Sequence, residues 1–280
     1  MFQYAFGYSL SKKHNDKVCF DLEFYDDQPK YISRRSECLR RFFPSLVLDV
    51  KPRPNSIKPF ERKVINHILY RFLKRGWKAS DKSFFFKEKR CQYYHTIPYK
   101  KDTLNYYDGY WQTEEYFSSF SDDIRRIFAP SVDIQNKVDT WLNNGLNTKK
   151  VALHVRRGDL FGKRGDKANK KTMSFYKNAI DYFSSLFGDY VLYVLSDDID
   201  WCRENLHLTD HKTYFVNNDG PDSAIVDLFI IAGCDCGIMS PSTFSWWGNW
   251  LGDSDKDRVV IAQKGFYYNT RFIPQRWLLM

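Results

Sequence analysis

The C-terminal half of the chain alternates between strand-like and helical patterns, and this constrains the fold most. Short apolar runs of strand length occur at 151–155, 190–195, 214–216, 236–239 and 258–262. Helical patterns separate them, around 174–187, 200–206, 222–233 and 244–251. Strands joined through helices imply βαβ crossovers, and therefore a parallel sheet covered by helices on both faces. The sequence predicts an α/β fold with a Rossmann-like domain at 146–280.

The N-terminal half carries fewer such signals. Phe2–Lys13 is amphipathic and is predicted to be helical, and Lys17–Asp21 is predicted to be a strand. The Asn- and Lys-rich stretch at 141–150 resembles a linker, so we expect a second Rossmann-like domain at 1–145. Because an α/β domain normally opens with a strand and this chain opens with a helix, we expect that domain to be incomplete at its start.

Composition excludes several classes of protein. No apolar run reaches about 18 residues, which excludes a membrane-spanning helix. The six cysteines form no C-x-x-C pair, and no signal peptide precedes the first helix, so neither a zinc site nor a secreted disulfide framework is expected. These features predict a cytoplasmic protein.

Positive charge is concentrated in one segment. Residues 51–101 contain fifteen Lys/Arg and three Asp/Glu, in a chain whose net charge is +9. This indicates an anionic partner, such as nucleic acid, a membrane surface or a phosphorylated substrate, or else the solvated face of a helix at Arg62–Lys78. Because no nucleic-acid-binding signature accompanies the charge, we expect no nucleic acid. An anionic membrane surface on the cytoplasmic side stays a candidate partner of this segment.

Arginines follow the first predicted strand of the C-terminal half, in His154-Val155-Arg156-Arg157-Gly158-Asp159. Ligands bind at the carboxyl ends of strands in open α/β sheets. Two adjacent guanidinium groups suit a diphosphate. The alternative is an ion pair between Arg156 or Arg157 and Asp159 at the surface.

Hydroxyl groups follow the strand at 236–239, in Ser240-Pro241-Ser242-Thr243-Phe244-Ser245. This segment opens a helix, where backbone N–H groups and hydroxyls bind anions. Ordinary capping of the helix by Ser242 or Thr243 uses the same geometry. With the arginines on a neighbouring strand, the segment would form the second side of a phosphate site.

Four further acidic residues are candidates for ligand contacts. Ser196-Asp197-Asp198 closes the strand at 190–195, and Asp198-x-Asp200 resembles weakly the D-x-D metal motif of many glycosyltransferases. We expect these residues to position the loop or contact the ligand, without a metal. The Asp227 carboxylate can accept two N–H bonds from the N1/N2 edge of guanine, or it can simply face solvent.

Together these segments resemble the α-1,2-fucosyltransferases, glycosyltransferase family 11. The resemblance lies in HVRRGD at 154–159, in Ser196–Asp198 with Trp201, and in DLFIIAGCDCGIMSPSTFSWWGNW at 227–250. MFQYAFG at 1–7, FDL at 20–22, GYWQ at 109–112, Tyr116-Phe117 and PQRW at 274–277 add to it. The match runs in collinear order over nearly the whole chain and is strongest from residue 151 onward.

The resemblance implies a GT-B-like fold, two Rossmann-type domains facing a cleft, and GDP-β-L-fucose as the donor substrate with no cofactor. The implied reaction moves L-fucose, with inversion, to the 2-hydroxyl of a galactose unit in a glycan such as a bacterial surface polysaccharide. It implies that Asp227 holds guanine and that His154 lines the fucose or nucleotide site. Substrate contacts are implied for further residues at the same motifs: Gln3, Arg156, Arg157, Ser196, Asp197, Ser242, Thr243, Phe244 and Ser245.

Catalysis would rest on Arg157, Asp159 and His154. Arg156 and Arg157 can offset the charge that develops on the departing diphosphate. Asp159 is the first candidate for the general base, and its alternative role is to orient an arginine.

One departure from the family concerns the start of the chain. In the family a Gly-Gly-x-Gly-Asn-Gln loop precedes the MFQYAFG segment, whereas here Met1 begins inside that motif. We therefore expect a longer natural product. A non-catalytic glycan- or nucleotide-binding protein derived from this fold is the alternative function.

Overall fold

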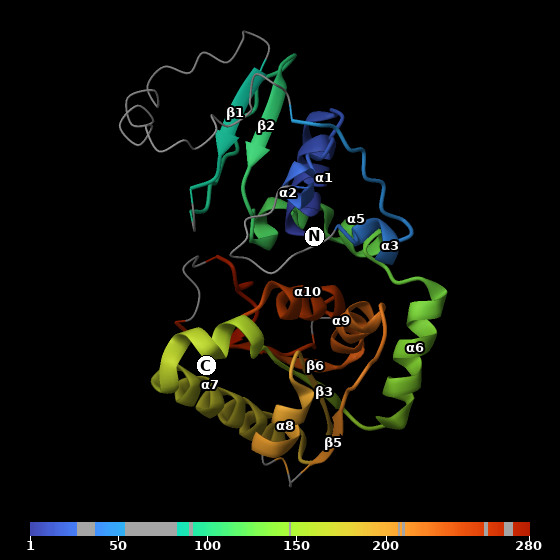
Figure 1. Cartoon of the computed structure of the whole chain (residues 1–280), viewed down its shortest axis with the longest axis vertical. Helices are drawn as coiled ribbons and strands as arrows, with labels where there is room; N and C mark the ends of the chain where they lie inside the picture. The colour runs from blue at the N-terminus through green and yellow to red at the C-terminus, as the bar shows by residue number, and fades with distance from the viewer. Residues whose placement is uncertain are drawn as a thin grey trace. The chain divides into compact units, whose positions relative to one another are not determined.

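The protein folds into two compact units (Figure 1). Unit 1 comprises residues 1–40 and 47–120, and unit 2 comprises 41–46 and 121–280. The computed structural model describes residues 1–26, 37–53, 83–89, 92–145, 147–206, 208, 211–254, 257–265 and 271–280, without the side chains of 158–170. The predicted helix at Arg62–Lys78 lies outside these residues, and so does most of the basic segment.

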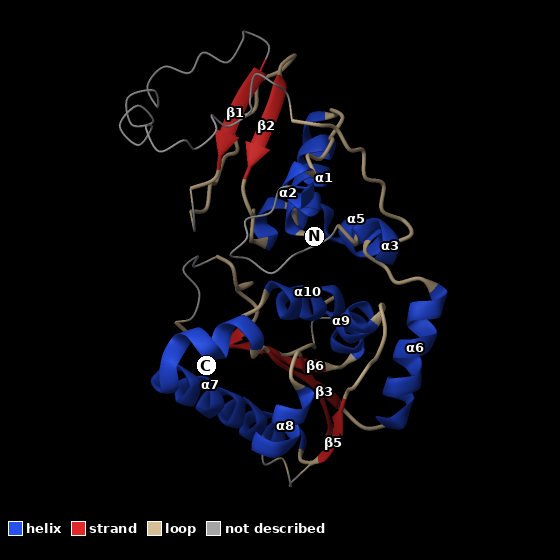
Figure 2. Cartoon of the chain, viewed as in Figure 1, coloured by secondary structure: helices blue, strands red, loops and turns tan. Residues whose placement is uncertain are grey.

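Unit 2 is built on a six-stranded parallel sheet (Figure 2). In spatial order its strands are β5 (Lys212–Phe215), β4 (Val191–Ser196), β3 (Lys150–Val155), β6 (Cys236–Met239), β7 (Val260–Ala262) and β8 (Leu278–Leu279). Every neighbouring pair is parallel. This confirms the predicted parallel sheet, and β8 is an additional strand that the sequence did not indicate.

Helices cover this sheet and bury its central strands. The helices of unit 2 are α5 (Ser121–Ile127), α6 (Val132–Leu142), α7 (Gly158–Phe187), α8 (Ile199–Asn205), α9 (Ser223–Gly233) and α10 (Thr243–Gly252), with a 3-10 turn at Asn143–Gly145. Val151, Leu153 and Leu192 are completely buried in the core. Alternating apolar strands and amphipathic helices can bury their hydrophobic surface only in such layers.

Helix α7 differs from the prediction. The sequence predicts a helix around 174–187, but the helix begins sixteen residues earlier, at Gly158. Residues 159–172 are mostly charged or polar, so the hydrophobic periodicity that marks a helix starts only near Met173.

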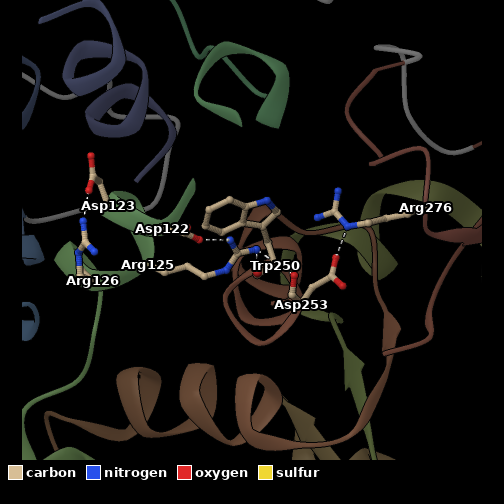
Figure 3. Close-up of polar contacts among 7 residues, drawn as sticks. All are labelled: Asp122, Asp123, Arg125, Arg126, Trp250, Asp253 and Arg276. Carbon is tan, nitrogen blue, oxygen red and sulfur yellow. Dashed lines mark hydrogen bonds and ion pairs between the residues drawn. The ribbon is translucent and has the colours of Figure 1, made fainter. Parts of the chain in front are cut away.

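The C-terminal end of α10 is fixed by two arginines (Figure 3). Arg125 Nη2 donates to the carbonyl oxygens of Trp250 and Asp253, at 3.3 and 2.9 Å, and its guanidinium lies over the Trp250 ring. The buried Asp253 carboxylate accepts from Arg276 Nε at 2.6 Å and from the Trp277 indole at 2.7 Å. Because carbonyls at a helix end lack partners within the helix, these contacts cap α10 and hold it in place.

A partly buried arginine caps the neighbouring helix α9. Arg258 donates to the carbonyl oxygens of Ile231, Ala232 and Cys234, and to Asn249 Oδ1. Asn249 is itself buried and lies against Gly237, where a side-chain methyl group would overlap its Oδ1. A residue larger than glycine at position 237 would therefore displace the Asn249 side chain.

Unit 1 contains a two-stranded parallel sheet and several short helices. Its elements are α1 (Phe2–His14), α2 (Glu23–Asp26), β1 (Ser83–Lys87), β2 (Leu104–Asp108) and 3-10 turns at Glu114–Tyr116 and Ser118–Phe120; α3 (Leu39–Phe42) spans the boundary with unit 2. The predicted helix at Phe2–Lys13 is confirmed. The predicted strand at Lys17–Asp21 is wrong, since only a single parallel bridge joins Phe20 to Val50.

Among the described residues of both units, no helix has the length and the apolar composition that crossing a membrane requires. The five described cysteines, Cys19, Cys38, Cys202, Cys234 and Cys236, are free thiols.

Candidate functional site

Three neighbouring strands of unit 2 bring the sequence motifs together at the carboxyl edge of the sheet. β3 lies between β4 and β6, and the last residue of β3, Val155, pairs with Ser196 at the end of β4. Arg156–Arg157 and Asp197–Asp198 therefore leave the sheet side by side, and Ser240–Ser242 follows β6 on the other side of β3. The neighbouring strand ends that we predicted are confirmed.

The two arginines pair with the aspartates that follow β4. Arg156 Nη1 lies 3.0 Å from Asp197 Oδ2, and the other oxygen of Asp197 accepts the backbone N–H of Arg157 at 2.8 Å. Arg157 Nε donates to Asp198 Oδ2 at 3.0 Å. The ion pair with Asp159 remains undescribed, because Asp159 lies in the first turn of α7, where side chains fall outside the described residues. The aspartates orient the guanidinium groups and offset part of their charge.

Arg157 also stacks on an aromatic ring. Its guanidinium carbon lies 3.8 Å from the centre of the Trp201 ring, which α8 carries. Asp198 is the N-cap of α8, and its Oδ1 accepts the backbone N–H of Trp201 at 3.3 Å. One carboxylate thus joins the arginine to the helix that carries its stacking partner.

His154 is buried at the end of β3 and bonded to the loop after β6. Its Nδ1 lies 2.6 Å from Ser240 Oγ, and its ring lies 5.3 Å from that of Phe244. Burial lowers the pKa of His154 to about 4, and Asp197 opposes this only in part. The ring is therefore neutral at physiological pH.

The hydroxyl segment after β6 caps α10. Ser242 Oγ accepts the backbone N–H of Phe244 at 3.2 Å, so the predicted capping by Ser242 is confirmed. Thr243 is exposed at the first position of the helix, whereas Ser245 is buried and its Oγ has no hydrogen-bond partner in the described structure. The start of α10 thus presents Thr243 to solvent, beside the ends of β3 and β6.

Asp227 lies in α9 and is bonded to the loop that follows β5. Asn218 Nδ2 donates to Asp227 Oδ1 at 2.5 Å, and Asn218 Oδ1 accepts the indole N–H of Trp141 at 2.8 Å. Burial raises the pKa of Asp227 to about 6, although the bond from Asn218 opposes the shift. Asp227 is half-buried and bonded to Asn218, so it differs from the simply solvent-facing residue of our alternative interpretation.

The start of α9 differs from the prediction. Asp222 stands at the N-cap position of the helix predicted at 222–233, but its side chain makes no capping bond. Its carboxylate instead pairs with Arg41 Nη2 at 2.7 Å and with Lys137 Nζ at 3.0 Å. Two nearby cations compete successfully with the helix N–H groups for this carboxylate.

The remaining predicted positions lie as follows. Ser196 Oγ accepts the backbone N–H of Asp198 at 3.0 Å, and Asp200 pairs with Arg203 at 2.8 Å. Gln3 lies in unit 1, where its Nε2 donates to the Gly109 carbonyl at 2.9 Å. Among the described residues no group of three or more His, Cys, Asp or Glu side chains is arranged to hold a metal ion.

Sequence reasoning missed three residues that orient the site: Trp201 beside Arg157, Ser240 beside His154 and Asn218 beside Asp227. Trp201 and Ser240 belong to motifs that we identified, but nothing in the sequence indicated their partners. Asn218 carried no signal, because its contact with Asp227 joins a loop to the following helix across nine residues.

Curated relatives align with nearly the whole chain. It is 29% identical over 292 residues to the O-antigen biosynthesis glycosyltransferase WbnK of Escherichia coli, covering 97% of this chain and 92% of the relative. It is 27% identical over 287 residues to an α-1,2-colitosyltransferase of Escherichia coli, covering 99% and 93%. A galactoside 2-α-L-fucosyltransferase of Caenorhabditis elegans is 30% identical over 158 residues, covering 54% and 43%.

A solved structure shares the fold. The crystal structure of the NodZ α-1,6-fucosyltransferase soaked with GDP-fucose superposes with a TM-score of 0.51 at 15% identity, over 89% of this chain and 87% of NodZ. The predicted GT-B-like α/β fold is therefore confirmed. The family model of glycosyl transferase family 11 matches residues 63–275, most of the chain. This match over most of the chain shows that the chain belongs to glycosyl transferase family 11.

Proposed function

We propose that the protein is an inverting α-1,2-fucosyltransferase that moves L-fucose from GDP-β-L-fucose to the 2-hydroxyl of a galactose unit. Family membership supports glycosyl transfer, and the relatives named above support the α-1,2 linkage. The relative named for O-antigen biosynthesis supports a bacterial surface polysaccharide as the acceptor.

The arginine pair at the end of β3 carries this proposal. Arg156 and Arg157 stand between the loop after β4 and the helix start after β6, and aspartates hold both guanidinium groups. Fixed cations beside a helix N-terminus favour a ligand with two phosphate groups. A nucleoside diphosphate sugar is such a ligand, and Asp227 on the neighbouring helix would bind its guanine.

The main role of these arginines in the reaction is to stabilise the leaving group. As the bond between fucose C1 and the β-phosphate oxygen breaks, its electron pair leaves with GDP and the sugar becomes cationic. The acceptor O2 attacks C1 from the opposite face, and its proton passes to a base. Guanidinium groups oriented in advance stabilise the negative charge that builds on the phosphate.

The base remains a proposal within this scheme. His154 is buried and its Nδ1 is bonded to Ser240 Oγ, so it fits a substrate-lining role better than a proton-accepting one. Asp159 stays the first candidate.

We also propose that transfer needs no divalent cation. The Asp198 carboxylate is engaged by Arg157 and by the Trp201 N–H, and Asp200 pairs with Arg203. The two carboxylates that would form a D-x-D metal site, Asp198 and Asp200, are therefore each paired with an arginine.

The decisive experiment offers GDP-fucose and a panel of galactosides in EDTA, with the product linkage read by NMR. Arg157→Ala should lower kcat/KM by about 100- to 1000-fold, the usual effect of losing one group that stabilises the leaving charge. The control is Arg203→Ala, which removes an exposed arginine from α8. Its kcat/KM should stay within about twofold of the wild-type value. Near-normal turnover by Arg157→Ala would reject the phosphate role.

A second candidate donor is tested in the same assay. The α-1,2-colitosyltransferase aligns with 99% of this chain, so GDP-colitose is the competing sugar nucleotide. The ratio of kcat/KM for the two donors decides between them. A protein that GDP protects against thermal unfolding without any turnover would instead be a non-catalytic binder.

Attachment to an anionic membrane surface through residues 51–101 is a further proposal. Its support is the local excess of fifteen Lys/Arg over three Asp/Glu. Binding to phosphatidylglycerol vesicles that weakens with salt is the expected result, and absence of flotation with such vesicles counts against it.

A further inference from the structure

Arg157 is held by contacts on two different sides of its guanidinium group. Nε at its edge donates to Asp198 Oδ2 at 3.0 Å, and its flat face lies 3.8 Å from the centre of the Trp201 ring. The side chain is 23% exposed, less than the 38% of Arg156. An edge contact alone leaves the plane of the group free to turn, whereas a contact on the face fixes that plane.

The indole is itself positioned by the residues that bind the arginine. Asp198 Oδ1 accepts the Trp201 backbone N–H, while Asp198 Oδ2 accepts Arg157 Nε. The backbone N–H of Asp198 in turn donates to Ser196 Oγ, at the end of β4. Residues 196–201 thus form one bonded unit between the sheet and the stacking ring.

We propose that Trp201 is a positioning residue, which holds the Arg157 guanidinium in the plane in which it meets the diphosphate of the nucleotide sugar. The inference rests on the proposed function. A free arginine side chain has many rotamers, and a binding site that has already restricted them binds its ligand more tightly. Trp is the aromatic partner that attracts a cation most strongly.

A second arginine–aromatic pair, between Arg203 on α8 and Phe215 on β5, supplies a matched control. Arg203 lies over the Phe215 ring at 5.7 Å, and its other contact is an exposed pair with Asp200 one turn away. Phe215→Leu therefore removes an aromatic ring near α8 without touching Arg157.

The test measures GDP affinity by calorimetry in a double-mutant cycle. Trp201→Leu should weaken GDP binding about fivefold, and Trp201→Phe, which keeps an aromatic face, about twofold. In the Arg157→Ala background, Trp201→Leu should have no further effect, because the group through which it acts is gone. Phe215→Leu should leave the affinity unchanged.

Other results of this double-mutant cycle would overturn the inference or the proposed function. An equal loss of affinity from Trp201→Leu in both backgrounds assigns Trp201 a purely structural role and overturns the inference, as does an unchanged affinity in a folded Trp201→Leu protein. If Trp201→Leu does not fold, the same cycle with Trp201→Phe decides the question by the same criterion. An unchanged GDP affinity in Arg157→Ala would overturn the proposed phosphate contact itself, independently of Trp201.

Discussion

Replacing the buried His154 should alter how the stability of the protein depends on pH. Asparagine is the informative substitution, because its side-chain amide places a polar atom near the position of Nδ1 and can still meet Ser240 Oγ. It cannot become charged. The comparison of wild type with His154→Asn therefore isolates the titration of one ring.

The magnitude follows from the pKa of the buried ring. Folding lowers the pKa of His154 from 6.5 to about 4, so between these values the unfolded chain binds a proton that the folded protein excludes. The contribution of the neutral His154 ring to the free energy of unfolding is therefore complete above pH 6.5, and it is lost as the pH falls toward 4. The full shift corresponds to about 3 kcal/mol, of which about 2 kcal/mol is lost between pH 7 and pH 5.

Urea unfolding at pH 7, 6 and 5, followed by tryptophan fluorescence, measures this loss. Six of the eight tryptophans lie in unit 2, which contains His154, so the signal reports mainly on the relevant unit. The other titrating groups contribute equally to both proteins and cancel in the difference between their unfolding free energies.

The wild type should lose about 2 kcal/mol more than His154→Asn on going from pH 7 to pH 5. A difference that stays constant within about 0.5 kcal/mol over this range refutes the reasoning, because the ring would then be hydrated or ion-paired in the folded protein.

Three other predictions concern the same unit. The pKa of about 6 at Asp227 predicts that loss of the carboxylate charge weakens GDP binding about tenfold between pH 7 and pH 5, in addition to the effect of the terminal phosphate of GDP, which titrates in the same range. Asp227→Asn, though a weaker binder, should lose the part that comes from the carboxylate, and calorimetry of both proteins at both pH values measures the difference. Gly237→Ala should lower the unfolding free energy by about 1–3 kcal/mol in urea titrations, because its methyl group meets the buried Asn249. Arg258→Met should cost about 3 kcal/mol in the same assay, because it leaves the carbonyls at the end of α9 unpaired; a loss below about 1 kcal/mol contradicts the capping role.

Much of unit 2 could be predicted from local sequence. The run at 236–239 coincides with β6, and the helices at 222–233 and 244–251 lie within a residue of α9 and α10 at their ends. Strand-length apolar runs and helical periodicity are properties of a few consecutive residues, so they can be recognised without knowledge of the fold. Helix α7 escaped detection over its first half because a polar segment carries no such periodicity.

The general position of the candidate site could also be predicted from local sequence. Parallel strands end at one edge of their sheet, so Arg156–Arg157, Asp197–Asp198 and Ser242 had to approach that edge. What they do there in catalysis stays a prediction. The two-domain division at 145/146 also stays a prediction, while the chain passes from one compact unit to the other between Phe120 and Ser121.

The sequence by itself determined the alternation of strands and helices, and which polar residues follow each strand. Only the tertiary structure decided that Val155 lies opposite Ser196, that Arg157 is stacked on Trp201, and that Asn218 holds Asp227. Strand order and register depend on pairing between segments far apart in the chain. A shift of one residue would turn every side chain to the other face of the sheet, so these contacts exist only once the whole core has packed.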